Sequence, residues 1–435
     1  MSMKNEQSTS RFDGSRFDIA VVGGGIAGLV AGITASESGA RVVVIDAHAA
    51  GGRACTTERD GFYYNIGPHA LYLAGHLQTF LAARTLDPSG GIPDIKRVRL
   101  LRDDALHRLS MNPFSIAATR LLRPRSRVRL LSLLARVPRM KTERFIGLAW
   151  QDFLGNEPDD VAGLLSMLVR TGTYVNAPET FDSGAALDQL KLALKGVRYV
   201  DGGWQTIVDS LVQMFARVGG TLLPDTPVTR ISSDGDVVLE TSSGVVYAHA
   251  VVIAGLAPAT AERLTGGAIR GGDQIGSIVH AAVLDLALDR VHDGLVFGID
   301  EALYLTPHAP VARLAPNGCG LVSILRYVPG GETQGSASDD RNRLSRFAEQ
   351  AGITKDHVVH ERYLHRLVVA NGFPTASGGG VRGRPTAEAL GIDGVFVAGD
   401  WVGPAGQLAD AASASAEAAA RHAIAHSARR ATAAV

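Results

Sequence analysis

The chain has 435 residues, with 43 basic and 43 acidic side chains and a formal net charge of zero. Its length exceeds the size at which one hydrophobic core stops growing, so we expect two domains. The balanced charge argues against a dedicated nucleic-acid-binding protein. The two cysteines, Cys55 and Cys319, belong to no zinc-ligand pattern, so we expect no metal site.

The first 33 residues bear on the location of the protein. Residues 1–15 are polar, and we expect them to be disordered. The apolar run at residues 19–33 is rich in glycine and shorter than the roughly 20 residues that cross a bilayer. A signal peptide would need a basic start and an apolar core, so the sequence predicts a cytoplasmic protein.

A glycine pattern follows the first predicted strand, which ends at Val22. Gly23, Gly25 and Gly28 form a GxGxxG motif at the start of a predicted helix. Gly23 permits a tight turn, Gly25 lets the backbone approach a pyrophosphate, and Gly28 lets the helix pack closely on the sheet. Free amides and the positive end of the helix would hold the phosphate. The motif therefore predicts a dinucleotide site.

The second predicted strand, residues 40–46, ends in Asp46, where an acid accepts hydrogen bonds from an adenosine ribose. This unit does not by itself distinguish NAD from FAD. Another GxGxxG, at residues 378–383, follows turn-forming residues and precedes Pro385, so we interpret it as a loop. The sequence thus predicts one dinucleotide site.

Gly52 and Arg53 come soon after this acid. Glycine lets a backbone approach a ligand closely, and arginine offers a fixed fork of donors to phosphate or ribose oxygens. Both features suit FAD, which extends beyond its pyrophosphate to a ribitol and a flavin ring. The alternative is a surface arginine that pairs with Glu58 or Asp60.

With these motifs the chain resembles the superfamily of flavin amine oxidases, phytoene desaturases and protoporphyrinogen oxidases. Three further segments carry the resemblance, "DGFYYNIGPHAL" at 60–71, "GTLLPDTPVTRI" at 220–231 and "GVFVAGDWVGPAGQLADAASASAEAAA" at 394–420. The resemblance implies an FAD site. It places Gly67-Pro68-His69 beside the isoalloxazine, the backbone of Val228 at the adenine and Asp400 at the ribitol.

The last segment supports the same interpretation from its own residues. A short buried strand ends at Gly399, and a strong helix former begins near Leu408. The positive end of that helix would stabilise negative charge on the N1–C2=O edge of a reduced flavin. Residues 395–425 contain no cysteine, so we expect FAD to be bound non-covalently. The predicted cofactor-binding residues are Gly23, Gly25, Ile26, Ala27, Gly28, Asp46, Ala47, Gly52, Arg53, Gly67, Pro68, His69, Val228, Gly399, Asp400, Gln407, Leu408 and Ala409.

We expect an α/β fold with two domains. Residues 16–78, 198–265 and 385–430 would form a discontinuous, Rossmann-like FAD-binding domain, with a strand meander at 221–255. Residues 79–197 and 266–384 would form an α+β substrate domain. Residues 74–200 are expected to be mostly helical, and residues 275–330 and 355–372 carry strand-like runs.

Residues 120–141 form a basic run that contains eight Arg or Lys residues and no acid. Three interpretations remain open for it. The run could be a solvated helix face, it could dock on an anionic membrane surface, or it could bind an acidic partner such as a carrier protein.

Oxidation by a flavin needs no protein nucleophile, because a hydride moves from a substrate carbon to flavin N5. His69 and His280 are the candidate catalytic residues. His69 could orient substrate or take a proton, and His280 stands where amine oxidases keep a lysine. We therefore predict an FAD-dependent oxidoreductase that dehydrogenates a hydrophobic small molecule in a biosynthetic pathway. The alternative is a flavin amine oxidase that produces an imine and hydrogen peroxide.

Overall fold

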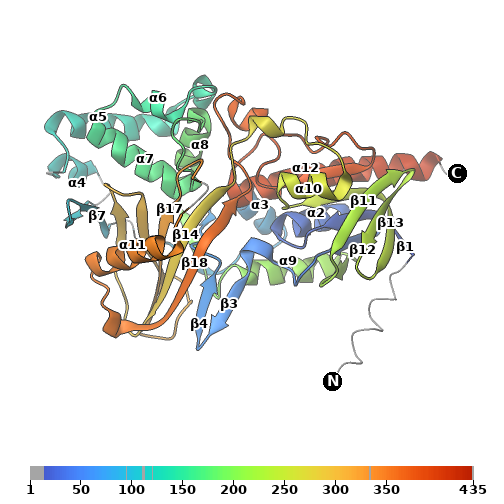
Figure 1. Cartoon of the computed structure of the whole chain (residues 1–435), viewed down its shortest axis with the longest axis horizontal. Helices are drawn as coiled ribbons and strands as arrows, with labels where there is room; N and C mark the ends of the chain where they lie inside the picture. Colours follow the sequence, from blue (N-terminus) through green and yellow to red (C-terminus); the bar gives the residue numbers. More distant parts are fainter. Residues whose placement is uncertain (1–13, 95, 110–112, 120, 333–334, 434–435) are drawn as a thin grey trace.

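The computed structural model describes residues 14–94, 96–109, 113–119, 121–332 and 335–433. Two large sheets, each covered by helices, build the molecule (Figure 1). Most of the predicted disordered segment 1–15 lies outside the described residues, but Ser15 already belongs to the first strand.

The first sheet is mostly parallel. Strands β10, β2, β1, β13 and β19 run parallel to their neighbours, and β12 and β11 continue from β13 as an antiparallel meander. In spatial order the strands are β10 (Thr221–Leu223), β2 (Val42–Ile45), β1 (Ser15–Val22), β13 (Gly244–Ala254), β12 (Asp236–Thr241) and β11 (Val228–Asp234), with β19 (Val395–Ala398) paired to β13.

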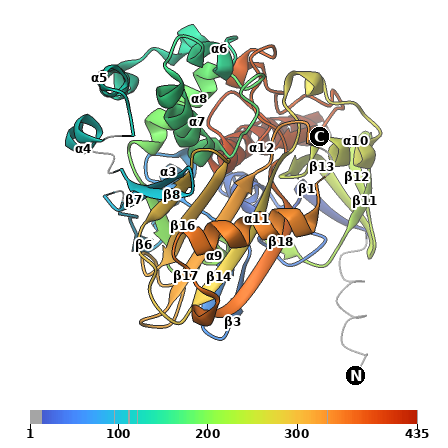
Figure 2. The same cartoon turned by 60° about the vertical axis from the view of Figure 1, so that its left-hand side comes forward.

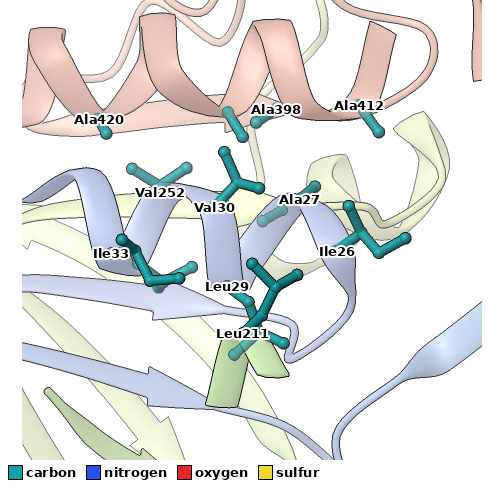
Figure 3. Packing of buried hydrophobic residues seen from close by; sticks show 14 of the residues in the cluster. Ile26, Ala27, Leu29, Val30, Ile33, Leu211, Val252, Ala398, Ala412 and Ala420 are labelled. Carbon is teal, nitrogen blue, oxygen red and sulfur yellow. The ribbon is translucent and has the colours of Figure 1, made fainter. Parts of the chain in front are cut away.

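Helices bury one face of this sheet. Successive side chains of β1 point to opposite faces, so Ile19 packs against the helices, whereas Ala20 packs toward the meander and α10. Figure 3 shows α2 between α12 on one side and Leu211 of α9 on the other. The helices of this region are α2 (Ile26–Ser36), α3 (His76–Ala82), α9 (Gln205–Arg217), α10 (Pro258–Thr265) and α12 (Leu408–Ala433).

The second sheet is mostly antiparallel, apart from the parallel pair β15 and β7. Its strands, in spatial order, are β18 (Val358–Ala370), β14 (Val279–Leu288), β17 (Gly320–Tyr327), β16 (Leu303–Ala309), β15 (Leu295–Gly298), β7 (Val98–Arg102) and β8 (Ala105–Arg108). Smaller strands elsewhere are β3 (Thr56–Arg59), β4 (Phe62–Asn65), β5 (Leu71–Tyr72), β6 (Gly90–Gly91) and β9 (Val197–Val200).

Helices cover both faces of the second sheet (Figure 2). On β14, Ala281 and Val283 belong to the core shared with the helical group, whereas Ala282 and Leu284 pack toward α11 (Ala337–Gln350). The helical group consists of α4 (Pro113–Ala118), α5 (Pro124–Arg136), α6 (Trp150–Leu154), α7 (Asp159–Thr173) and α8 (Ser183–Ala193). This alternation decides which side chains of β14 reach the site described below.

Helices make up most of the regular structure of residues 74–200, as expected, but these residues also contain a hairpin that the sequence did not indicate. Residues 98–108 form the hairpin β7–β8 at the edge of the second sheet. Asp103 and Asp104 make its turn and both have positive φ, at 50° and 57°. Two central residues with positive φ are typical of a tight type I′ turn, in which Asp is tolerated. Among the described residues, no helix has both the length and the apolar content that a bilayer span requires.

Candidate functional site

A central cavity lies where the two sheets meet, and both contribute to its walls. The parallel strands β1, β2, β13 and β19 all end at this cavity, which is the edge of an open α/β sheet where ligands bind. The cavity is lined mainly by Gly23, Gly25–Ala27, Asp46, Gly51–Ala54, Ile66–Tyr72, Thr171, Tyr174, Trp204, Ala254–Leu256, Ala281, Val283, Leu367–Val369, Asp400, Leu408–Asp410 and Ala412.

Two glycines fix the loop between β1 and α2. Gly23 has φ +110°, and a Cβ there would lie 2.3 Å from the carbonyl oxygen of Ala254. A Cβ on Gly28 would lie 1.7 Å from the carbonyl oxygen of Gly23. No side chain fits at either position, so the loop stays tight and α2 begins directly at the cavity.

Asp46 follows β2 and lies against this loop. One carboxylate oxygen, Oδ2, accepts a hydrogen bond of 2.5 Å from the amide of Gly24. The other, Oδ1, accepts one of 2.8 Å from the amide of His48. Asp46 is thereby held in the cavity wall beside the glycine loop.

Arg53 and Asp400 meet in this cavity although 347 residues separate them. Nη1 of Arg53 donates to Oδ2 of Asp400 at 2.7 Å and to the carbonyl oxygen of Val369 at 2.8 Å. Asn371 adds two hydrogen bonds to the same carboxylate, from its amide at 3.0 Å and from Nδ2 at 3.2 Å. Arg53 therefore pairs with Asp400, and within the described residues it forms no ion pair with Glu58 or Asp60, the partners that the surface alternative required.

Charge and burial oppose each other at this pair. Burial acts to lower the pKa of the Arg53 guanidinium, but the charge of Asp400 and its hydrogen bond hold that pKa above its ordinary value. The Asp400 side chain is only 2% exposed, whereas Arg53 is 36% exposed toward the cavity. The pair thus presents the edge of a guanidinium, whose other donors face the cavity.

A second buried arginine fixes the loop that leads to α12. Nη1 of Arg384 donates to the carbonyl oxygen of Asp400 at 3.0 Å, and Nη2 donates to those of Ala405 and Gly406 at 3.0 and 2.9 Å. Arg384 follows the loop with the second GxGxxG, which contains one turn of 3₁₀ helix at Gly380–Gly383. That loop therefore holds the end of β19 in place and does not itself line the central cavity.

Helix α12 points its N-terminus at the cavity. It begins at Leu408, which has φ +53°, and both Leu408 and Ala409 line the wall. Asp410 in the first turn is 4% exposed and accepts a hydrogen bond from the amide of Leu77 at 2.9 Å. Burial raises the pKa of Asp410 to about 6, against the lowering effect of the amides of Leu77 and His76. Asp410 thus links α12 to the start of α3.

His69 also lines this cavity, and its side chain is neutral. Burial lowers its pKa from the ordinary value, with a smaller lowering from the charge of Arg53. Nδ1 lies 2.9 Å from the carbonyl oxygen of Gly67, and because a carbonyl only accepts, Nδ1 carries the proton. The ring packs on Trp204 with centroids 4.8 Å apart. Its orientation is therefore fixed from two sides.

The predicted cofactor residues divide into two groups. Thirteen of them line the central cavity, namely Gly23, Gly25, Ile26, Ala27, Asp46, Gly52, Arg53, Gly67, Pro68, His69, Asp400, Leu408 and Ala409. Gly28, Ala47, Val228, Gly399 and Gln407 do not line it. Gly28 packs on Gly23, the amide of Gly399 donates to Ser415, and Nε2 of Gln407 donates to the carbonyl oxygen of Ala185.

The structure corrects the placement of His280. His280 lines a separate side cavity with His365 and Arg366, on the other side of β14 from Ala281. Adjacent residues of a strand point to opposite faces, so a one-residue change of position removes a side chain from the site. Ala281 and Val283 face the central cavity instead.

Sequence reasoning missed several side chains of the cavity wall. Trp204, Thr171 and Tyr174 line it, and Tyr174 donates from its hydroxyl to the carbonyl oxygen of Pro68 at 2.7 Å. The Gly202-Gly203-Trp204 turn was a possible signal for the tryptophan. Thr171 and Tyr174 lie at the end of a helix with an ordinary amphipathic pattern, so nothing local marks them.

The cavity fits an extended dinucleotide. Gly25 and Gly52 line it, and a Cβ on either would meet no atom of the protein nearer than 3.6 Å, so there is room for a ligand close to the backbone at both residues. Nε1 of Trp204 is buried beside the cavity without a hydrogen-bond partner. The glycine loop, Asp46, Arg53 and the α12 N-terminus supply donors and acceptors along the whole length of the cavity.

Comparison with known proteins agrees with this geometry. The sequence profile of flavin containing amine oxidoreductases matches residues 26–424. The fold and the site define an FAD-dependent oxidoreductase, with a mixed α/β architecture of several sheets. The chain belongs to the flavin containing amine oxidoreductase family. No protein with a curated description matches it by sequence.

Several solved structures share the fold at low sequence identity. An oxidoreductase from Methanosarcina mazei is 18% identical with a TM-score of 0.72, over 92% of this chain and 99% of that one. Putrescine oxidase bound to putrescine is 15% identical with a TM-score of 0.74, over 94% and 99%. A CLA-producing fatty acid isomerase from P. acnes is 14% identical with a TM-score of 0.71, over 93% and 98%. At these identities the likeness concerns the fold alone.

Proposed function

We propose that this oxidoreductase dehydrogenates a hydrophobic small molecule in a biosynthetic pathway. FAD, when bound, supplies the chemistry by accepting a hydride at N5. The observation that carries the proposal is the wall that the second sheet gives to the central cavity. It consists of Ala281, Val283, Leu367, Val368 and Val369, with no ionisable side chain among them. An apolar wall of this kind positions an apolar substrate and excludes water.

We further propose which segments form each domain and which groups bind the cofactor. The segments 16–78, 198–265 and 385–430 would form the FAD-binding domain, and the segments 79–197 and 266–384 would form the substrate domain. Arg53 would bind the middle of the cofactor through donors that Asp400 leaves free. The positive end of α12 would face the flavin ring and favour its negatively charged form. FAD would be held non-covalently.

His69 would orient the substrate. Its neutral ring is fixed by Gly67 and Trp204, so it can position a substrate atom without moving. The lowered pKa of His69 keeps the ring uncharged near neutral pH, which is compatible with an apolar ligand. We assign no role in this reaction to His280, because it lies in the side cavity.

The second candidate function is oxidation of an amine. Tyr72, Tyr174 and Trp204 line the central cavity, and aromatic faces attract a substrate ammonium. The apolar face of β14 argues against amine oxidation. It places Ala281 and Val283 in the cavity wall, near the position where amine oxidases keep a lysine. Asp400 is already paired with Arg53 and is not free to bind a cation.

Anaerobic mixing of the purified yellow protein with panels of substrates tests the proposal. We expect apolar polyenes or cyclic hydrocarbon-rich molecules to bleach the flavin absorbance, and primary and secondary amines to leave it unchanged. In air, turnover of the apolar substrate is followed by its change in absorbance. Bleaching by amines alone, together with release of hydrogen peroxide, would overturn the proposal in favour of the amine oxidase.

A further inference from the structure

We propose that helices α4 and α5 form a docking surface for a membrane that contains anionic lipids. The exposed face of α5 consists of Arg125, Val128, Ser132, Ala135 and Arg136, which follow one another at helical spacing. The opposite face is anchored in the protein, since Ser126, Leu130 and Leu133 are buried. The helix therefore lies flat on the body of the molecule with its basic face outward.

The cations of this surface have no carboxylate partner among the described residues, although Arg139 donates to the carbonyl oxygen of Ala135 at 3.4 Å. Arg125, Arg136, Arg139 and Lys141 are exposed, and within the described ranges none of the four forms an ion pair. Arg129, on the same helix, is the exception, because it pairs with Glu157. Other arginines differ in this respect: Arg198, Arg326 and Arg362 pair with carboxylates, whereas exposed Arg217, Arg263 and Arg429 are scattered over separate helices and form no ion pair within the described residues. The positive charge of α5 is thus left for something outside the chain.

Apolar side chains protrude beside these cations. Phe114 on α4 is 86% exposed and Val128 on α5 is 70% exposed, and they are the two most exposed large hydrophobic side chains among the described residues. A solvated helix face would not need an aromatic ring at this position. Cations that contact lipid headgroups next to an aromatic side chain that enters the acyl boundary are the two components of interfacial binding.

The position of the surface favours a membrane over an acidic protein partner. Helices α4 and α5 lie at an outer edge of the molecule, at the end opposite to the C-terminal end of α12 (Figures 1 and 2). The formal charge of the whole chain is zero, so attraction to an anionic surface depends on this local cluster and orients the molecule. No groove for a protein segment is needed for such a contact.

Sedimentation with lipid vesicles tests this inference without any turnover, so its result is independent of the proposed reaction. The probes are vesicles of pure phosphatidylcholine and vesicles with 30% phosphatidylglycerol. We expect the flavin-loaded protein to sediment with the anionic vesicles at low salt and to be released by 0.5 M salt. It should not sediment with the neutral vesicles. The variant R125E/R136E/R139E should bind the anionic vesicles more than tenfold more weakly.

The matched control is R217E/R263E/R429E, which changes the net charge equally at exposed residues of α9, α10 and α12. It should bind like the unaltered protein. F114S/V128S should weaken binding severalfold and leave its salt dependence intact. Unchanged flavin absorbance and melting temperature show that each variant is folded. Equal binding by both triple variants, absence of binding to anionic vesicles, or retention on polyglutamate without sedimentation would overturn the inference.

Discussion

At the scale of single residues, the ion pair between Arg53 and Asp400 connects the early and the late part of the chain. From the sequence alone, Arg53 could equally have been a surface arginine paired with a neighbouring acid. The structure instead places Arg53 2.7 Å from Asp400 in the central cavity. A carboxylate that is 2% exposed depends on its partners, because an unpaired buried charge is costly.

Replacing Arg53 by alanine should therefore weaken both the cofactor site and the fold. Without the guanidinium, Asp400 keeps only its hydrogen bonds from Asn371, and we expect a loss of about 3 kcal/mol in the free energy of unfolding. The dissociation constant for FAD, measured by titration of the flavin-stripped protein, should rise at least tenfold. Arg59→Ala, which removes a 63% exposed arginine nearby, is the control and should change neither quantity. Undiminished FAD affinity in Arg53→Ala would contradict the role given to this residue.

Asp410 predicts a pH dependence of stability. Its pKa is about 6 in the folded protein and 3.8 in the unfolded chain, so the folded state holds the proton more tightly. The contribution of Asp410 to stability is therefore most favourable below pH 3.8, falls as the pH rises through this window, and carries its full penalty above pH 6, on the order of 3 kcal/mol. Asp410→Asn stays neutral and keeps an acceptor for the amide of Leu77. The melting temperature of the variant relative to the unaltered protein should therefore rise between pH 4.5 and pH 7.5.

The exposed Asp273→Asn is the control, because its carboxylate lies in solvent. Its melting temperature should follow that of the unaltered protein at every pH. A difference between Asp410→Asn and the unaltered protein that stays constant across the same pH range would show that Asp410 titrates normally.

At the scale of elements, α2 and the loop before it depend on the absence of one side chain. Gly28→Ala would place a Cβ 1.7 Å from the carbonyl oxygen of Gly23, and backbone on both sides prevents relaxation. Overpacking of this kind costs about 3 kcal/mol, so we expect the free energy of unfolding of the variant to fall by at least this amount. We also expect the variant to be purified without FAD. Absorbance at 450 nm and thermal unfolding measure the two effects.

Gly163→Ala is the matched control in another helix. A Cβ at Gly163 of α7 would meet no atom within 4 Å, so the same substitution should stabilise the protein by about 0.5–1 kcal/mol. Equal changes in stability for Gly28→Ala and Gly163→Ala would contradict this explanation. Close packing of α2 against Gly23 would then not be the reason why a glycine stands at position 28.

Elements with a strong local pattern could be predicted from the sequence, and those with a weak one could not. The strand–helix–strand unit around α2 and the start of α12 at Leu408 follow from glycine spacing, buried strands and alanine content. The hairpin at 98–108 was missed because its short strands look like part of a helical region. The side of β14 on which His280 lies also escaped prediction, since strand parity depends on register with β18, which carries irregularities near this residue.

At the scale of the whole molecule, the central cavity is a product of convergence. Thirteen of the predicted cofactor residues meet there because strands far apart in the sequence end at one edge of the first sheet. The residues that complete the wall, such as Thr171 and Tyr174, come from the helical group and the second sheet. Their contribution depends on how the two sheets sit together, and no local sequence pattern records that arrangement.

Both sheets form walls of the cavity, so bound FAD should make the two sheets unfold together in a single transition. A ligand at 100 times its dissociation constant adds about 2.7 kcal/mol when it binds only the folded state. The melting temperature of flavin-stripped protein should therefore rise with added FAD, and far-UV circular dichroism and flavin fluorescence should report the same midpoint. Two separate transitions at saturating FAD would show that the sheets unfold independently.

The packing of α12 on α2 has a consequence for how the protein is made. Helix α12 starts 372 residues after the end of α2 (408 − 36), so at about 5–20 residues per second it follows α2 out of the ribosome roughly 20–75 s later. Until then the apolar face of α2 that Ala412 and Ala420 later cover has no partner (Figure 3). A chain truncated before residue 408 would therefore leave this face of α2 uncovered and would lack the part of the cavity wall that Leu408 and Ala409 supply.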